Sequence, residues 1–417
     1  MGDSETPAER RESSALSTST DESAPNTSSR RVDRRTALTC VGSVGYALGV
    51  GHYLGIDSAL DPPDGTVEIE TAYVRSDDGQ LFGEPGSRTT LEPITRTVPA
   101  DWYHRVETAL DVHATLVRTQ LPGYLNSAVV PGSYESGTVT LSIGVESDDL
   151  WSLPGDVASV LSRIGIEWDG TLEGIEIDIE DEDSIDELER DASPEPTQLV
   201  RNANVDPVPG GVRCAVSSSY ATLTPAVYRS GEAEPLFATA LHAFPGWDDS
   251  VGETLSLPTL VDRRPLTIGH VVDTLPDVDV AIARPVSAIR PGSVVGRTNG
   301  IPIAGQFTRW GLADLVARGE SVAKIGGTSG RTTGDVHGID AATCVTTDRC
   351  QGGQLKWGTE ADISDGDSGS VTIYPDHDEV DGAIVASVNS ARTWWPGQDH
   401  VWGVSAHTLT ERHGYHF

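Results

Sequence analysis

Three short segments, far apart in the chain, carry residues that together could perform nucleophilic catalysis. Ser368 lies in a Gly-Asp-Ser-Gly segment, His242 closes an apolar segment, and Asp279 stands directly before a second apolar segment. A serine hydroxyl becomes an effective nucleophile when an imidazole accepts its proton, and a carboxylate that orients this imidazole also stabilises its charged form. The sequence therefore predicts a triad in which Ser368 attacks, His242 is the general base and Asp279 orients the imidazole.

The glycine before the nucleophile has a predicted role of its own. Attack by a serine on a carbonyl group creates an oxyanion, which is stabilised by backbone N–H donors held about 3 Å away. Glycine at position 366 allows a backbone conformation that points its amide inward. We expect the amides of Gly366 and Ser368 to form this oxyanion hole.

The order His, Asp, Ser along the chain is informative, because unrelated folds that share this chemistry place the three residues in different orders. With the segments Phe237-Ala-Thr-Ala-Leu-His242, Asp277-Val-Asp279-Val-Ala281 and Asp365-Gly-Asp-Ser-Gly-Ser370, residues 208–417 resemble the chymotrypsin-like serine peptidases, of the secreted bacterial or haloarchaeal type with an amino-terminal prosegment. The resemblance implies an all-β catalytic domain of two six-stranded antiparallel barrels, with the active site in the cleft between them. It also implies hydrolysis of peptide bonds through an acyl-enzyme, without a cofactor.

Two details depend on this resemblance. Asp277 and Asp279 would point the same way on a strand, and Asp279 is preferred because the family places its acid immediately before the apolar residues. Family members often have Ala before the histidine and Cys after it, whereas this chain has Leu241 and Ala243. The disulfide that is common at that place in the family is therefore absent here.

The resemblance also suggests residues that select the substrate. Asp362, six residues before the nucleophile, matches in position the acid at the bottom of the specificity pocket of trypsin-like members, which would favour Arg or Lys; the alternative is one more surface acid in an acidic chain. Ser387 and Asn389 lie on the apolar strand after the nucleophile, where family members pair with the substrate backbone.

Composition excludes some kinds of partner. The 417 residues carry 63 acidic and 29 basic side chains, a formal charge of −34, which argues against binding to nucleic acid through neutralised phosphates. We interpret the acidity as a solvated surface that high salt screens, as in proteins of extreme halophiles. The only lysines are Lys324 and Lys356. We expect a monomer that acts on a protein or peptide substrate and holds no metal, since no Cys/His cluster has zinc spacing.

The four cysteines predict one disulfide. Cys344 and Cys350 enclose a short loop that a disulfide can close in an oxidising compartment. Cys214 would then remain as a buried small hydrophobe, and Cys40 lies in the expected targeting segment.

Changes in composition divide the chain into five parts. Residues 1–33 form a polar leader that we expect to be disordered, and Arg34-Arg35 opens the segment 34–60, which resembles a twin-arginine export signal, with a membrane anchor as the alternative. Residues 61–191 are predicted to be a small α+β domain, 192–207 an acidic, proline-containing linker, and 208–417 the all-β domain. The protein would be secreted or held at the cell surface, with membrane contact only if the amino-terminal segment is retained.

Within residues 61–191 the alternation of apolar and polar residues predicts strands at 66–71, 137–143 and 174–179. A helix is expected to begin at Asp101, with Trp102, Val106, Leu110, His113 and Val117 on one face, and to end before Pro122; a shorter one is expected at 156–164. We interpret this region as a pro-domain that is cut off on maturation; a permanent accessory domain is the alternative.

The sequence as a whole predicts an exported serine endopeptidase that uses His242, Asp279 and Ser368. Two alternatives remain. The first is a catalytically inactive protein of the same fold that serves as a binding module at the cell surface, and the second is an esterase that uses the same triad.

Overall fold

The computed structural model describes residues 65–76, 90–119, 124–145, 159, 161–162, 172, 174–181, 185–187, 199–200, 206–217, 219–246, 249–258, 265–286, 289–346, 349–375, 377–393 and 400–417. All of them belong to one compact unit, residues 58–417. The expected leader, the expected export signal and most of the expected helix at 156–164 lie outside the described residues.

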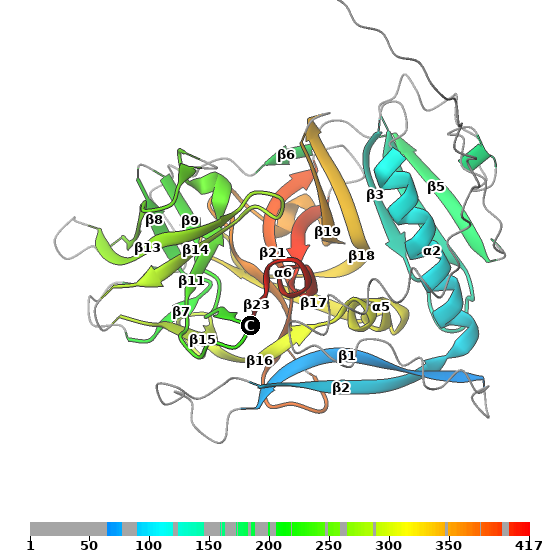
Figure 1. Ribbon diagram of the computed structural model, residues 1–417, viewed down its shortest axis with the longest axis horizontal. Helices are drawn as coiled ribbons and strands as arrows, with labels where there is room; N and C mark the ends of the chain where they lie inside the picture. Colours follow the sequence, from blue (N-terminus) through cyan, green and yellow to red (C-terminus); the bar gives the residue numbers. More distant parts are fainter. Residues whose placement is uncertain are drawn as a thin grey trace, which may run out of the picture. The chain divides into compact units, whose positions relative to one another are not determined.

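Among its described residues, the first half of this unit contains a long hairpin, the helix α2 and a small group of strands (Figure 1). The elements are β1 (Thr66–Ser76), β2 (Thr90–Pro99), α2 (Ala100–Thr119), β3 (Tyr124–Val130), β4 (Val139–Val145), β5 (Ile175–Asp181) and β6 (Ile185–Glu187). The strands predicted at 66–71, 137–143 and 174–179 are confirmed as β1, β4 and β5.

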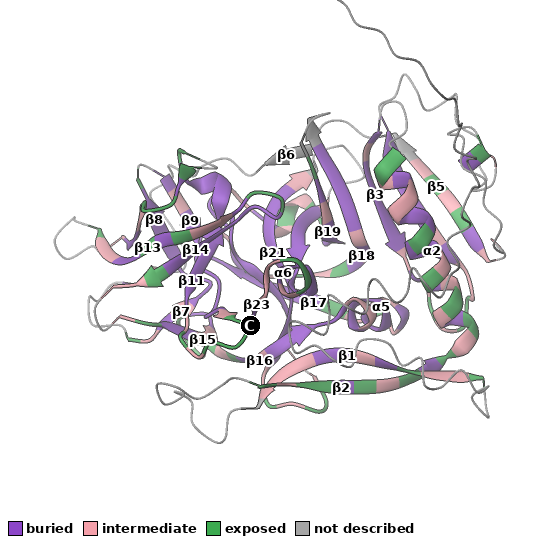
Figure 2. Ribbon diagram, viewed as in Figure 1, coloured by how far each residue is buried: buried purple, intermediate pink, exposed green. Residues whose placement is uncertain are grey.

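Helix α2 is confirmed, and its amphipathic pattern explains its position. Trp102, Val106, Leu110 and His113 are buried on one face, as predicted, with Leu116 completing the face in place of Val117. This face packs against β3 and β4, and the opposite face is open to solvent (Figure 2). Asp101 lies within the first turn, where its negative charge interacts favourably with the helix dipole. Each fully buried apolar side chain contributes about 2 kcal/mol to folding.

Residues 208–417 are mostly strands with few helices. One sheet has six strands in the order β11-β14-β13-β12-β8-β9. Its members are β8 (Arg213–Val216), β9 (Ser219–Thr222), β11 (Phe237–Ala240), β12 (Thr254–Leu257), β13 (Leu266–Leu275) and β14 (Val280–Pro285). This sheet has a hydrophobic core of its own, which includes Phe237, Phe244 and Ile268.

The second sheet has fifteen strands, and its main path runs β2-β1-β16-β21-β20-β17-β18-β3-β4-β5. The strands from the second half are β7 (Val208–Gly210), β15 (Pro291–Val295), β16 (Ile301–Phe307), β17 (Ser321–Gly326), β18 (Gly330–Thr346), β19 (Arg349–Trp357), β20 (Val371–Tyr374), β21 (Ala383–Thr393) and β22 (Val401–Ser405). The remaining elements are β10 (Tyr228–Arg229), which pairs with β23 (Tyr415–His416), the helices α5 (Arg309–Ala317) and α6 (Ala406–His413), and the short turns η3 (Leu241–Ala243) and η5 (Glu360–Asp362). The arrangement of two closed six-stranded barrels stays a prediction.

Strands from the two halves of the chain pair with each other. Strand β1 pairs with β16 and strand β3 pairs with β18, both antiparallel. One hydrophobic cluster contains Trp102 and Leu141 from the first half together with Phe307 and Trp357 from the second. The described strands of the first half therefore belong to the same sheet as those of the second half, and the two halves share a core. Whether they act as a pro-domain stays a prediction.

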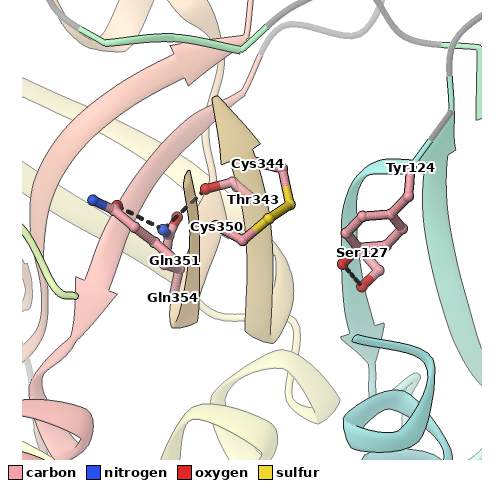
Figure 3. Close-up of a disulfide and its surroundings, with 7 residues drawn as sticks. All are labelled: Tyr124, Ser127, Thr343, Cys344, Cys350, Gln351 and Gln354. Atoms are coloured by element: carbon pink, nitrogen blue, oxygen red, sulfur yellow. Dashed lines mark hydrogen bonds between the residues drawn. A yellow bond between two sulfur atoms is a disulfide. The ribbon is translucent and has the colours of Figure 1, made fainter. Parts of the chain in front are cut away.

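The predicted disulfide is confirmed. Cys344 and Cys350 are bonded across the β18–β19 hairpin, where they stand opposite each other in register (Figure 3). Next to them, Thr343 pairs with Asn126 of β3, so the disulfide closes the hairpin that joins the two halves. Cys214 is buried, and burial raises the pKa of its thiol to about 12, which makes it unreactive near neutral pH.

Among the helices of the described residues, none combines the length and the apolarity needed to cross a lipid bilayer.

Candidate active site

The sheet brings His242 and Asp279 together through strand pairing. Strand β11 ends at Ala240 and strand β14 begins at Val280, and these two residues are partners in an antiparallel pair. The residues that follow β11 and precede β14 therefore lie at the same end of the sheet. The backbone N–H of His242 donates to Asp279 Oδ1 at 2.8 Å, and that of Leu241 donates to the Asp279 carbonyl at 3.0 Å.

The three predicted catalytic side chains form one continuous chain of hydrogen bonds. His242 Nδ1 lies 2.6 Å from Asp279 Oδ2, and His242 Nε2 lies 2.8 Å from Ser368 Oγ. All three residues are buried, with exposed fractions of 5%, 1% and 2% for His242, Asp279 and Ser368. With Nδ1–H donating to the carboxylate, Nε2 is left to accept the serine proton, which is the geometry that general-base catalysis requires.

Asp277, the alternative to Asp279, lies elsewhere. Its side chain is 51% exposed, and its Oδ2 lies 3.1 Å from Nε2 of His413. Asp279 is held at a positive φ of 55°, a backbone conformation that Asp tolerates better than most residues. Residues 276–279 form the turn between β13 and β14, so the expectation that both carboxylates point the same way on a strand is wrong. The structure thus brings Asp279 and not Asp277 to His242.

The turn around the nucleophile leaves two amides available. Gly366 has a φ of 88°, and its carbonyl accepts the Thr222 hydroxyl at 2.8 Å. The Ser368 carbonyl accepts the Thr222 amide, also at 2.8 Å. The N–H groups of Gly366 and Ser368 donate to no group among the described residues, so both are free to meet an oxyanion.

Gly369 keeps this turn close to the first sheet. Its φ is 86°, and a Cβ atom at this position would lie 2.3 Å from the Thr222 carbonyl oxygen and 2.5 Å from Thr239 Oγ1. No side chain fits there without moving the backbone, so glycine is required on the carboxyl side of the nucleophile for a steric reason.

A buried ion pair fixes the residue that precedes the nucleophile. Lys324 Nζ lies 2.8 Å from Asp367 Oδ2, and both side chains are 0% exposed. Asp367 also accepts the backbone N–H groups of Thr328, Ser329 and Ser364 at 2.9, 3.2 and 3.1 Å. The carboxylate is thereby satisfied from several sides, which a buried charge requires.

Lys324 was not among the predicted site residues. Burial lowers the pKa of Lys324 below its usual value, and the charge of Asp367 opposes this effect. The sequence contained a signal: one of only two lysines stands in the apolar strand Val322-Ala323-Lys324-Ile325, and a lysine inside such a strand needs a buried acid. Sequence alone could not show which of many acids that would be.

Asp362 contributes its carboxylate to its own turn. Its Oδ2 accepts the Thr359 backbone N–H at 2.8 Å and the Thr359 hydroxyl at 3.0 Å. The first of these bonds, with the Thr359 side chain accepting the Asp362 backbone N–H in return, forms a capping box for η5. The side chain is half-buried. The predicted role of Asp362 at the bottom of a specificity pocket stays a prediction.

Ser387 and Asn389 lie within the sheet. The Asn389 N–H donates to the Ser370 carbonyl, and its own carbonyl accepts the Gly369 N–H, both at 2.8 Å. Ser387 is paired with Thr372 of β20 and, on its other side, with Ser405 of β22. The backbone of Asn389 therefore holds the nucleophile turn in place. Further along the strand, β21 has other pairing partners.

That further part of β21 is Ala391–Thr393. There β22 covers one side, and β6 pairs with the other, antiparallel, with Ala391 opposite Glu187 and Arg392 opposite Asp186. Arg392 Nη2 lies 3.3 Å from Asp365 Oδ1, so a positive charge stands beside the nucleophile segment. Within the described ranges, His, Cys, Asp and Glu side chains do not gather into a group of three or more that could hold a metal.

Comparisons with known proteins find structural neighbours only. No protein-family profile matches the chain, and no curated protein matches its sequence. A glutamic acid specific serine protease is similar with a TM-score of 0.39 and 17% identity, over 50% of this chain and 99% of the other. The Nocardiopsis protease NAPase gives a TM-score of 0.37 and 16% identity, over 51% of this chain and 98% of the other.

Protease A of Thermobifida fusca gives a TM-score of 0.36 and 19% identity, over 50% of this chain and 97% of the other. The structural neighbours are thus chymotrypsin-like serine proteases, and the similarity involves half of this chain. The function proposed next rests on the triad geometry of this chain.

Proposed function

We propose that the protein is a serine endopeptidase that hydrolyses peptide bonds through an acyl-enzyme. The observation that carries this proposal is the position of the His242 imidazole, with one nitrogen at the Asp279 carboxylate and the other at the Ser368 hydroxyl. Ser368 Oγ attacks the scissile carbonyl while Nε2 takes its proton, and the amides of Gly366 and Ser368 bind the oxyanion. The imidazolium then protonates the leaving amine, and water repeats the cycle to release the acid.

An extended peptide would bind along the edge of β21 at Ala391–Thr393, in the place that β6 takes in this structure. Strand addition provides main-chain hydrogen bonds that do not depend on the substrate sequence. Asn389 supports this arrangement because its backbone joins β21 to the nucleophile turn. The edge and the reactive hydroxyl are therefore held at a fixed distance from each other.

Export and maturation belong to the same proposal and rest on the sequence. The pair Arg34-Arg35 before a mildly apolar segment supports export in the folded state. Residues 61–191 would be a pro-domain, cut off after export in the linker 192–207. The acidic, lysine-poor composition suits function at high salt.

The test uses a fluorophosphonate probe in high salt with the wild-type protein and Ser368→Ala. We expect labelling of the wild type alone, together with hydrolysis of azocasein. Labelling that persists in Ser368→Ala would refute the nucleophile. Hydrolysis of small esters without hydrolysis of azocasein would indicate an esterase, and the absence of both activities would indicate an inactive binding module.

A further inference from the structure

Thr222 stands where the six-stranded sheet meets the segment that carries the nucleophile. It is the last residue of β9, which is an end strand of that sheet, and it is fully buried. Its hydroxyl donates to the Gly366 carbonyl at 2.8 Å, and its backbone N–H donates to the Ser368 carbonyl, also at 2.8 Å. One residue of the first sheet thus binds the segment 366–368 at both ends.

The two bonded carbonyls frame the amides of the proposed oxyanion hole. Along the chain, the Gly366 N–H comes just before the first of these carbonyls, and the Ser368 N–H lies between them. The Asp367 N–H donates to the Ser364 carbonyl at 2.9 Å. The peptide group between Gly366 and Asp367 is therefore held at its oxygen by the Thr222 hydroxyl and at its nitrogen by Ser364.

The Thr222 hydroxyl also accepts a hydrogen bond. The Gly327 N–H donates to Thr222 Oγ1 at 2.9 Å, which leaves the hydroxyl proton for the Gly366 carbonyl. Gly327 and Gly366 are both buried. An apolar side chain of the same shape would leave a donor and an acceptor in the interior without partners, and such groups are expensive to leave unpaired.

Thr222 is joined as well to the strand that leads to the general base. Thr239 Oγ1 donates to the Thr222 carbonyl at 2.7 Å, and Thr239 stands three residues before His242. Strands β9 and β11 are the two end strands of the six-stranded sheet, and the Thr224 N–H, which donates to the Ala238 carbonyl at 3.0 Å, connects this part of the chain to β11 again. A continuous path of hydrogen bonds thus runs from the nucleophile turn through Thr222 to the histidine strand.

The chemistry requires these two parts to stay in register. The His242 imidazole must reach Ser368 Oγ while the two amides reach the oxyanion, yet His242 follows β11 of the six-stranded sheet and Ser368 precedes β20 of the large sheet. A misplacement on the order of 1 Å in such an arrangement can cost about 100-fold in rate. A residue that binds both parts is therefore in a position to control turnover.

We propose that Thr222 is a positioning residue for the reaction: its hydroxyl holds the oxyanion amides in place relative to His242, without contact with the substrate. This inference rests on the proposed function, because it presumes that the amides of Gly366 and Ser368 bind an oxyanion on the way to the acyl-enzyme. The hydroxyl then matters for the transition state and little for substrate binding.

The experiment compares the full-length wild type with Thr222→Val, Thr222→Ser and Thr71→Val in high salt. Valine keeps the shape of threonine and removes the hydroxyl, whereas serine keeps the hydroxyl. Thr71→Val is the matched control, because the buried Thr71 hydroxyl also donates to a backbone carbonyl, that of Ile94 at 3.1 Å, in the first half of the chain.

Three quantities are measured on each protein. The first two are kcat and KM for p-nitrophenyl acetate, a small ester that needs no extended binding site, recorded as a function of pH. The third is the rate of labelling by a fluorophosphonate. Urea unfolding checks that each variant is folded under the assay conditions. If Thr222→Val is not folded there, Thr222→Ala, which lacks the hydroxyl and is smaller, takes its place with the same expectation.

We expect Thr222→Val to lower kcat by about 30-fold, somewhat less than the loss of a whole oxyanion donor costs, and to leave KM within about threefold. The labelling rate should fall in parallel, because the phosphonyl oxygen uses the same amides. Thr222→Ser should stay within about threefold of the wild type, and Thr71→Val within about twofold. The pH at which kcat/KM is half-maximal should be the same in all variants, because the contact between His242 and Asp279 is unchanged.

The outcomes separate the two hypotheses. If the wild type neither hydrolyses the ester nor is labelled, the proposed function fails and the inference fails with it. If the wild type is active and a folded Thr222→Val keeps kcat within about threefold, the triad stands and the role of Thr222 is overturned. Equal losses in Thr222→Val and Thr222→Ser, or a change in KM alone, would indicate a general effect of packing and would overturn it too.

Discussion

Lys324 Nζ and Asp367 Oδ2 form an ion pair at 2.8 Å with no exposed surface, directly beside the nucleophile. Asp367 also collects three backbone N–H donors from two different segments, 328–329 and 364. The pair thus ties β17 to the turn that carries Gly366 and Ser368. A buried charge that loses its partner is strongly destabilising, so the shape of the turn that carries Gly366 and Ser368 depends on Lys324.

Lys324→Met tests this dependence. The variant leaves Asp367 charged and without its cation, so we expect a loss of about 3 kcal/mol in the free energy of unfolding and a large fall in the rate of fluorophosphonate labelling. Urea unfolding in high salt measures the first quantity. The matched control is the double variant Lys324→Met/Asp367→Asn, which removes both charges and should recover at least about 1 kcal/mol. Equal stability of the single and double variants would contradict the role of the pair.

Asp279→Asn tests the orienting carboxylate. The side chain would keep its size, but its amide could face Nδ1 with a donor, which favours the wrong tautomer of His242. We expect turnover to fall by roughly 10,000-fold while the fold is kept. Asp277→Asn is the matched control, because its side chain lies at the surface next to His413, and it should change turnover by less than about twofold. A similar loss in both variants would rule out the assignment of Asp279.

The local parts of the site were predictable from the sequence. Ser368, His242 and Asp279 each stand in a short segment whose chemistry is written in neighbouring residues, and strand pairing at Ala240 and Val280 brings two of them together. The prediction could not assign the backbone of Asn389, because its hydrogen bonds to Gly369 and Ser370 depend on how the nucleophile turn folds back onto β21.

The organisation of the two halves was harder to predict. The alternation in residues 66–71 predicts a strand, but it does not say which strand is the partner, and β1 pairs with β16, more than two hundred residues later. The same holds for β3 with β18 and β6 with β21. Long-range pairing is decided by complementary surfaces across the whole fold, which periodicity in one segment does not encode.

The disulfide provides a prediction about stability. Cys344 and Cys350 close a loop with a sequence separation of 6, and in the chain-entropy description so short a loop contributes about 2 kcal/mol. Cys344→Ala/Cys350→Ala should lower the free energy of unfolding by this amount, with the triad chemistry intact. Cys214→Ala is the control for loss of a thiol. If the double variant and the wild type under reducing conditions are both as stable as the oxidised wild type, the disulfide has no stabilising role.

Arg392 provides a prediction about specificity. Its guanidinium lies at the edge of β21 where a peptide would bind, opposite the register position of Asp186. A partly exposed charge pair contributes up to about 1 kcal/mol, so peptides with Asp or Glu at the position facing Arg392 should be favoured by roughly fivefold in kcat/KM. Arg392→Gln should remove this preference without affecting hydrolysis of a neutral peptide by more than about twofold. An acidic preference that survives in Arg392→Gln would show that another group reads the substrate.

His416 provides a prediction about pH. Burial, together with the nearby charge of Arg75, lowers the pKa of its imidazole to about 4, and the ring stacks on Tyr228 at 5.9 Å. Unfolding exposes the ring and returns its pKa to about 6.5, so the unfolded chain binds the proton first as the pH falls. The contribution of His416 to the free energy of unfolding is therefore complete above pH 6.5 and is lost between about pH 6.5 and pH 4, by about 3 kcal/mol in total.

His416→Phe keeps a ring against Tyr228 and cannot titrate, so its free energy of unfolding should fall less steeply than that of the wild type over this range. His113 and His400 titrate in the same direction and remain in both proteins, so the difference between the two curves isolates His416. Parallel curves would show that His416 does not hold its low pKa in the folded chain.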